Sequence, residues 1–278
     1  MKLYISMSPY LIQQIRLIHA ITETPYEIVL PPDEAKKYEP LVSRFSMRFT
    51  EGDNGVVDLG EYITIDHAEP ITGIGDLRRP LIFPHSITQY CRSLWGERKY
   101  RFSFAGLITE KRKVLLDHWT QKNIGNKKKN RYVEKVENKL FALLGMKHKL
   151  DQKKMEPLVV WQSDRGRAFP IKSWDDDYYR FLLNSQFVLC PSGDHVWSYR
   201  FFESILCGAI PVVEESCRAY QGFRYHTMQE SAKKLVWSED VAIYNYSLCL
   251  DRITVPVEVL SQELSKIIGE LEKDRMRP

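Results

Sequence analysis

The stretch that decides the fold runs from Phe187 to Val213 and reads FVLCPSGDHVWSYRFFESILCGAIPVV. A short apolar run ends at a Pro-Ser-Gly-Asp turn, an amphipathic segment follows, and a second apolar run begins after Gly208. This order predicts a strand, a loop, a helix and a strand. Gly208 is expected to end the helix, because glycine is favoured just beyond a helix C-cap.

The same alternation of strand and helix extends along the rest of the chain. It predicts an α/β fold, in which a parallel sheet is covered by helices. The N-terminal part is short for a complete doubly wound domain. Strands are expected at residues 2–7, 26–30, 55–60, 61–65, 100–105 and 157–163. Helices are expected at residues 9–21, 132–145, 178–186 and 256–274.

The composition is that of a globular protein. The 278 residues are 44% hydrophobic and 27% charged, and the net charge of +4 identifies no partner by itself. Basic residues gather between Lys122 and Lys154, where Lys and Arg outnumber acidic residues eleven to three. This segment is either a patch for an anionic partner or, as we favour, a solvated face of helix and loop.

The cysteines and the apolar segments bear on the cellular environment. Five cysteines with no CxxC pair argue against a disulfide framework. Ser8 and Pro9 interrupt the apolar run at the start of the chain, so no signal peptide is expected. No segment approaches the roughly 18 apolar residues of a membrane span. We therefore expect a soluble protein of the cytoplasm or of a host-cell cytoplasm.

The start of the helix in the opening stretch carries polar residues that suit a ligand. Ligands of open α/β sheets bind beyond the carboxyl ends of the strands, and helix N-termini attract phosphate. Arg200 lies in the first turn, Glu203 lies one turn later on the same side, and Ser198 is expected to cap the helix or to contact the phosphate. A surface pair of Arg200 and Glu203 remains the alternative, as does a simple turn at Gly193.

A second segment, FAGLITEKR at residues 104–112, repeats this arrangement. It predicts a strand, a turn at Gly106, a helix capped by Thr109 and Arg112 in the first turn. Two strand-to-helix turns that each offer an arginine would suit a diphosphate, although Arg112 as a solvent-facing charge is the alternative.

Residues 178–213 resemble the signature region of exostosin-type glycosyltransferases, and the resemblance extends over roughly residues 100–225. It implies a GT-B-like architecture, in which two Rossmann-like domains face a cleft and the N-terminal domain is shortened here. It also implies a nucleotide-sugar donor and inversion at the anomeric carbon. The motif is matched by Tyr179, Arg180, Leu183, Ser185, Phe187, Pro191, Gly193, Ser198, Arg200, Glu203, Gly208, Ile210, Pro211 and Val212.

The resemblance assigns roles to the residues around the two helix starts. Arg112 and Arg200 would bind the donor diphosphate, and Glu203 would bind the ribose. The remaining residues expected at the donor site are Gly106, Gly193, Asp194, His195, Ser198 and Tyr199.

Three domains or segments are expected. Residues 1–90 would form the acceptor-side Rossmann-like domain, and residues 91–255 would form the domain that binds the nucleotide sugar. Residues 256–278 would form a C-terminal helix that packs back on the N-terminal domain.

Inverting transfer needs a base that deprotonates the acceptor hydroxyl. The segment EYITIDHAEP offers Asp66, His67 and Glu69 after a predicted strand, and Asp66 is the preferred candidate. His67 as a structural histidine and Asp66 as a loop cap are the alternatives. The acidic run at residues 175–177 precedes a helix and favours an N-cap over a metal site, so metal independence is expected.

The expected function is transfer of a sugar from a UDP-sugar, with UDP-xylose as the first choice, to a hydroxyl of an oligosaccharide or glycoprotein. No nucleic-acid partner is expected. One alternative is a fucosyltransferase-like enzyme that uses GDP-fucose. Another is a catalytically inactive glycan-binding or partner subunit with the same fold.

Overall fold

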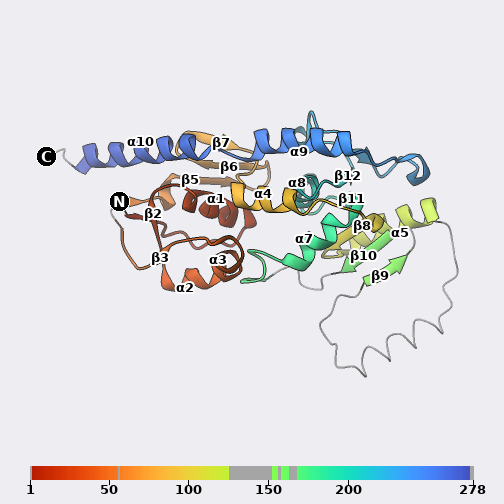
Figure 1. The fold of residues 1–278 in the computed structure, drawn as a ribbon, viewed down its shortest axis with the longest axis horizontal. Coiled ribbons are helices and arrows are strands. Elements are labelled where there is room, and N and C mark those ends of the chain that lie inside the picture. The colour runs from red at the N-terminus through yellow and green to blue at the C-terminus, as the bar shows by residue number, and fades with distance from the viewer. Residues whose placement is uncertain (1, 56, 125–151, 156–157, 163–167, 276–278) are drawn as a thin grey trace, which may run out of the picture.

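A computed structural model describes residues 2–55, 57–124, 152–155, 158–162 and 168–275. Within these residues the chain forms two mainly parallel sheets and one small antiparallel sheet, with helices packed around them (Figure 1). The α/β fold with parallel sheets is therefore confirmed. The predicted helix at 132–145 and most of the Lys-rich segment lie outside the described residues.

The first sheet is built from the N-terminal residues and is parallel throughout. Its strand order is β3-β2-β1-β4, and Leu3 in the centre pairs with Ile28 on one side and Val57 on the other. The strands are β1 (Lys2–Tyr4), β2 (Glu27–Leu30), β3 (Thr50–Glu51) and β4 (Val57–Asp58). The helices of this region are α1 (Ile12–Thr22), α2 (Pro32–Ala35) and α3 (Glu39–Phe45).

The sequence of α1 explains why these residues form a helix. It contains no Gly or Pro, and the side chain of Gln14 accepts hydrogen bonds from the backbone N–H groups of Tyr10 and Leu11, both at 2.9 Å. Residues 12–21 are all buried, including the polar side chains of Gln13, Arg16 and His19. A helix buried on all sides packs inside the protein rather than on its surface.

The second sheet corrects the expectation that the early strands all belong to one parallel sheet. Strands β5 (Ile63–Asp66), β6 (Ile71–Ile74) and β7 (Leu77–Arg79) pair antiparallel in the order β5-β6-β7. The connections are too short for the crossover that a parallel pair requires. The strand predicted at residues 61–65 therefore belongs to a meander, and Asp66 ends it.

The third sheet contains the stretch from Phe187 to Val213. Its order is β13-β12-β11-β8-β10-β9, and all neighbours are parallel except β9 and β10. Its strands are β8 (Tyr100–Gly106), β9 (Gln152–Met155), β10 (Leu158–Gln162), β11 (Ser185–Cys190), β12 (Ile210–Val213) and β13 (His226–Thr227). The helices of this part of the chain are α4 (His85–Ser93), α5 (Glu110–Ile124), α7 (Asp176–Leu183), α8 (Tyr199–Leu206) and α9 (Glu239–Ile253).

The predicted strand, loop, helix and strand are thus β11, the loop at 191–198, α8 and β12. Gly208 has a φ of 71°, as expected of a glycine that ends a helix. The strand order reverses around β8, because β10 lies on one side of it and β11 on the other. Such a switch point opens a crevice at the carboxyl ends of the two strands, where ligands of open α/β sheets bind.

The C-terminal helix α10 (Val257–Arg275) contacts the N-terminal elements. Figure 1 shows α9 and α10 running one after the other along one side of the molecule. The hydroxyl groups of Tyr26 and Ser265 are 2.6 Å apart, and the backbone N–H of Asp76 donates to Glu263 at 2.6 Å. These contacts tie α10 to the residue just before β2 and to the turn between β6 and β7.

The cysteines and the apolar helices can also be compared with the sequence analysis. The five cysteines are free, as the absence of a disulfide framework predicts, and four of them are buried. Among the described helices, none is both long enough and apolar enough to cross a membrane.

Candidate active site

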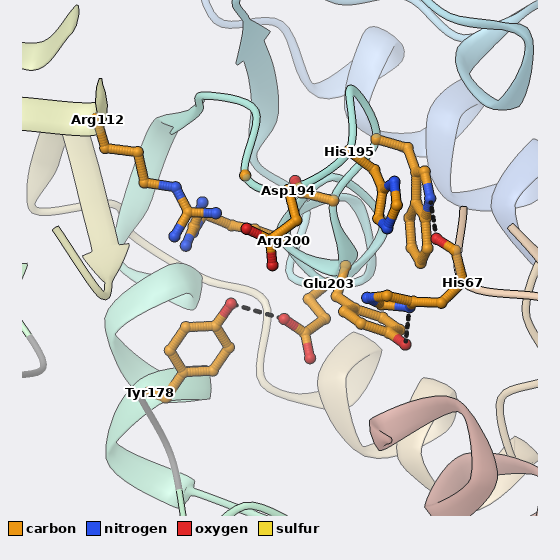
Figure 2. A pocket seen from close by; sticks show the side chains of 11 residues that line it. His67, Arg112, Tyr178, Asp194, His195, Arg200 and Glu203 are labelled. Atoms are coloured by element: carbon orange, nitrogen blue, oxygen red, sulfur yellow. Dashed lines mark hydrogen bonds between the residues drawn. The ribbon is translucent and has the colours of Figure 1, made fainter. Parts of the chain in front are cut away.

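A pocket of about 190 Å³ opens at the carboxyl ends of β8 and β11, where the strand order reverses (Figure 2). Its walls come from the loop before α8, the first turns of α5, α7 and α8, and the turn after β5. The residues that line it are His67, Arg112, Tyr178, Gly193, Asp194, His195, Trp197, Ser198, Tyr199, Arg200 and Glu203.

Arg200 is buried at the start of α8 and is only 9% exposed. Its Nε donates to the carbonyl of Ala105 at 2.6 Å, and its guanidinium carbon lies 4.5 Å from the ring centre of Phe104. Its NH1 group is buried and has no hydrogen-bond partner among the described residues. A buried guanidinium whose donors are not all satisfied is a strong site for an anion.

Arg112 approaches the pocket from the first turn of α5. Its Nε donates to the carbonyl of Ser192 at 3.1 Å, and its NH1 donates to the carbonyl of Leu107 at 3.0 Å. Thr109 Oγ1 accepts from the backbone N–H of Arg112 at 3.3 Å, so Thr109 caps the helix as predicted. Burial, together with the nearby charge of Arg200, lowers the pKa of Arg112. Two cations that disfavour each other's charge would both be stabilised by an anion between them.

Two glycines leave the space that these arginines occupy. Gly106 has a φ of 143°, and a Cβ at this position would collide with the guanidinium of Arg200. A Cβ on Gly193 would collide with the guanidinium of Arg112 in the same way. Both glycines therefore serve a close approach of side chain to backbone, beyond the turn that the sequence indicates.

Ser198 occupies the N-cap position of α8, but its side chain forms no capping bond. Its backbone N–H donates to the Tyr220 hydroxyl at 2.8 Å, and its Oγ is buried without a partner among the described residues. Of the two expected roles, capping is therefore not realised. Two unsatisfied polar groups, Ser198 Oγ and Arg200 NH1, belong to the first turn of one helix.

Glu203 is 1% exposed and lies one turn further along α8. Its carboxylate accepts hydrogen bonds from the hydroxyls of Tyr178 at 2.6 Å and Tyr179 at 3.0 Å. Arg16 in turn donates to the Tyr179 hydroxyl at 3.3 Å. Arg200 and Glu203 are both buried, so a surface ion pair is the wrong interpretation of their spacing.

The three candidates for the base lie at and beyond the end of β5. Asp66 is exposed, and its Oδ1 accepts from the backbone N–H groups of Ala68 at 2.8 Å and Glu69 at 3.2 Å. Its carboxylate therefore caps its own turn, and neither Asp66 nor the exposed Glu69 lines the pocket. His67 does line it, and Figure 2 shows the imidazole pointing toward Asp194 and Glu203.

Residues 84–221 match the family model of the exostosin GT47 domain. The match confirms the resemblance to the exostosin-like family over these residues. Among curated proteins and among solved structures no significant match was found. A domain of this family indicates a glycosyltransferase, a class of enzyme that uses a nucleotide-sugar donor and a glycan acceptor. The exostosin domain supplies ten of the eleven residues that line the pocket, and His67 comes from outside it.

Asp194 and His195 belong to the loop of the exostosin domain between β11 and α8. The backbone N–H of Gly193 donates to the His195 carbonyl at 3.1 Å, which closes the loop into a tight turn. The rings of His195 and His67 meet edge to face with centres 5.2 Å apart. Trp197 Nε1 donates to the carbonyl of His67 at 3.0 Å, so this loop holds the β5 turn against the pocket.

The acidic run at residues 175–177 caps a helix of the exostosin domain, as predicted. Asp175 accepts from the backbone N–H of Tyr178 at 3.0 Å, and Asp176 pairs with Arg44 and Arg180. Among the described residues, no group of three or more His, Cys, Asp or Glu side chains is arranged to hold a metal ion.

Tyr178 and Gln13 are among the residues of the site that the sequence analysis did not single out. Tyr178 lines the pocket and binds Glu203, and its only signal is its place at the start of the exostosin motif. Gln13 belongs to α1, and its amide oxygen contacts two residues that line the pocket, His67 and Tyr199. A glutamine within the apolar run of a buried helix is the signal that marks it, because such a side chain must find partners.

Proposed function

We propose that this protein is an inverting glycosyltransferase that transfers a sugar from a UDP-sugar to a glycan hydroxyl. The observation that carries the proposal is the pair of buried, unsatisfied groups at the start of α8, Arg200 NH1 and Ser198 Oγ. They lie at the N-terminus of α8, whose dipole favours an anion, and at a switch point of the sheet. A diphosphate supplies the oxygens that would satisfy all of these groups.

In the proposed donor complex Arg112 and Arg200 bind the diphosphate, and Glu203 binds the ribose. The hydrogen bonds from Tyr178 and Tyr179 fix the orientation of the Glu203 carboxylate. Asp194 and His195 face the donor sugar from the loop before α8. Gly106 and Gly193 allow the two guanidinium groups to reach the phosphates, and Tyr199 lines the same pocket.

The proposed reaction is a single displacement at the anomeric carbon, which inverts its configuration. The negative charge that develops on the leaving diphosphate is stabilised by the two arginines and by the N-terminus of α8. We propose that these groups suffice without a metal ion. Residues 1–90 would provide the acceptor side, residues 91–255 the donor side, and residues 256–278 a helix that packs on the acceptor side, in a GT-B-like arrangement around the pocket.

Calorimetric titration with UDP and with GDP tests the donor site. UDP is expected to bind, and Arg200→Ala is expected to weaken binding roughly tenfold to hundredfold, as loss of a charge-assisted hydrogen bond would do. Arg79→Ala, which removes an exposed arginine of β7, is the matched control and should bind UDP as the original chain does. UDP binding that is unchanged in Arg200→Ala would refute the assignment of the site.

The same titration separates the alternatives. Binding of GDP without binding of UDP would favour a fucosyltransferase-like enzyme that uses GDP-fucose. Binding of neither nucleotide would favour a catalytically inactive glycan-binding or partner subunit. Release of UDP from UDP-xylose, UDP-glucuronate, UDP-galactose and UDP-N-acetylglucosamine, with and without EDTA, identifies the sugar. Complete loss of release with EDTA would refute metal independence.

A further inference from the structure

We propose that His67 is the general base of the reaction and that Gln13 and Tyr199 hold its imidazole in the tautomer that this role requires. The inference rests on the proposed function, because a base is needed only if an acceptor hydroxyl is activated. It replaces Asp66 as the preferred base, since the Asp66 carboxylate caps the turn that carries His67.

The neighbours of the Gln13 amide determine its orientation. Gln13 is 1% exposed, and its Nε2 lies 3.3 Å from the backbone carbonyl of Asp66 and 3.3 Å from Thr72 Oγ1. A backbone carbonyl only accepts hydrogen bonds, so the amide nitrogen must face it. The amide oxygen of Gln13 therefore faces the other way, where it accepts from the Tyr199 hydroxyl at 2.8 Å.

The amide oxygen then determines which nitrogen of His67 carries the proton. His67 Nδ1 lies 3.1 Å from Gln13 Oε1, and an oxygen with no hydrogen can only accept from it. Nδ1 must therefore be protonated, which leaves Nε2 with a free lone pair in the neutral ring. Figure 2 shows that the imidazole extends away from its backbone into the pocket, so the end of the ring that bears Nε2 faces the substrate side.

Packing holds the imidazole in this position. The ring of Tyr199 stacks against it at a centre distance of 5.8 Å, and the ring of Trp197 meets it at 5.3 Å. Trp197 also donates to the His67 carbonyl. A base that is fixed in rotamer and tautomer needs little rearrangement when the acceptor arrives.

The charges around His67 suit a group that begins neutral and gains a proton. Burial and the neighbouring His195 lower the pKa of His67, with a smaller contribution from Lys172, so the ring is neutral at physiological pH. Asp194 and Asp66 act in the opposite direction. Once the ring has taken a proton, these two carboxylates stabilise the imidazolium that forms.

The acceptor hydroxyl gives its proton to Nε2 of His67, while its oxygen forms a bond to the anomeric carbon of the donor. The bond from this carbon to the diphosphate oxygen breaks, and its electron pair stays on the diphosphate between Arg112 and Arg200. The imidazolium returns its proton to water after the products leave.

The tautomer is tested directly by nuclear magnetic resonance on protein labelled with ¹⁵N in histidine. Spectra of the original chain and of His67→Gln assign the His67 signals. In neutral protein, Nδ1 is expected in the protonated, pyrrole-like range and Nε2 in the unprotonated, pyridine-like range. A signal pattern with the proton on Nε2 would overturn the proposal, and this readout needs no substrate.

Catalysis is tested by release of UDP from the four UDP-sugars named above, with water as the acceptor. His67→Gln should lower the rate about 100-fold or more while UDP still binds, because a general base contributes on the order of 10²–10⁴ in rate. His226→Gln, which changes a histidine paired with Glu230 far along the chain, is the control. An unchanged rate in His67→Gln would overturn the role of His67 and leave the donor site standing. If the original chain does not bind UDP, the proposed function itself is overturned.

The positioning role of Gln13 has its own readout. Gln13→Leu removes the nearer acceptor for Nδ1 and leaves the Tyr199 hydroxyl at 3.5 Å. Part of the His67 population should then shift its proton to Nε2, and the rate should fall without a matching change in UDP affinity. Tyr199→Phe keeps the ring stack but removes one bond to Gln13, and should give a smaller shift in the same direction. If Gln13→Leu fails to fold, Tyr199→Phe decides. A His67 tautomer that is unchanged in the variant that folds would refute positioning by Gln13.

Discussion

Arg200 Nε and the carbonyl oxygen of Ala105 lie 2.6 Å apart, which joins the first turn of α8 to the carboxyl end of β8. The two residues are 95 positions apart in the chain. The NH1 group of the same arginine is buried and has no hydrogen-bond partner among the described residues.

Replacement of Gly106 by alanine should damage the proposed donor site. The new Cβ would collide with the guanidinium of Arg200, and the φ of 143° disfavours any residue other than glycine. We expect UDP affinity to fall roughly tenfold or more, as it does when a charge-assisted bond is misplaced. Calorimetric titration measures this. Gly96→Ala is the control, because a Cβ there meets no atom within 4 Å. Equal loss in both variants would contradict the explanation.

Removal of the Tyr179 hydroxyl should destabilise the protein. Tyr179→Phe takes a donor from the buried carboxylate of Glu203 and an acceptor from the buried Arg16. We expect the free energy of unfolding to fall by about 1–3 kcal/mol, as for a buried polar group that loses its partner. Urea unfolding measures the change. Tyr244→Phe removes a hydroxyl bonded to the Gly222 carbonyl at the surface and should cost about 0.5 kcal/mol or less.

The stability of the protein should fall in mildly acidic solution. Burial and the charge of Arg16 lower the pKa of His19 from 6.5 to about 3. Below pH 6.5 the unfolded chain therefore binds a proton that the folded chain does not bind until the pH nears 3. Its contribution to stability is present above pH 6.5 and is lost as the pH falls toward 3.

Urea unfolding at pH 7 and pH 5 tests this contribution. The fully developed slope for one proton is about 1.4 kcal/mol per pH unit. His19→Leu should remove this part of the slope, whatever it does to stability at pH 7. Identical pH dependence in the variant and in the original chain would show that His19 does not supply it.

The N-cap of α7 should contribute measurably to stability. Asp175→Ala removes the acceptor for the backbone N–H of Tyr178 and should cost about 1 kcal/mol. Asp177→Ala removes an exposed neighbour in the first turn, which acts mainly through the helix dipole, and should cost less. Thermal unfolding of the two variants compares them. A larger loss for Asp177→Ala would contradict the assignment of the cap.

The sequence by itself determined the elements around the pocket. The apolar runs, the polar loop and Gly208 define β11, α8 and β12, because strand and helix periodicity and glycine chemistry act over a few residues. The exostosin motif in the same residues indicated the donor side and both arginines. The alternation of strand and helix predicts one parallel sheet for the early strands, whereas the short connections of the second sheet allow only antiparallel pairing.

The tertiary structure decided which side chains meet. The spacing of Arg200 and Glu203 in α8 does not show that one contacts the end of β8 and the other contacts Tyr178 and Tyr179. Nor does the order Asp66, His67 show that the carboxylate turns back on its own loop while the imidazole enters the pocket. Such contacts join residues that are far apart in the chain, or depend on how a turn packs against another element. Local sequence patterns do not reveal contacts of these two kinds, because the packing of the sheets and helices determines them.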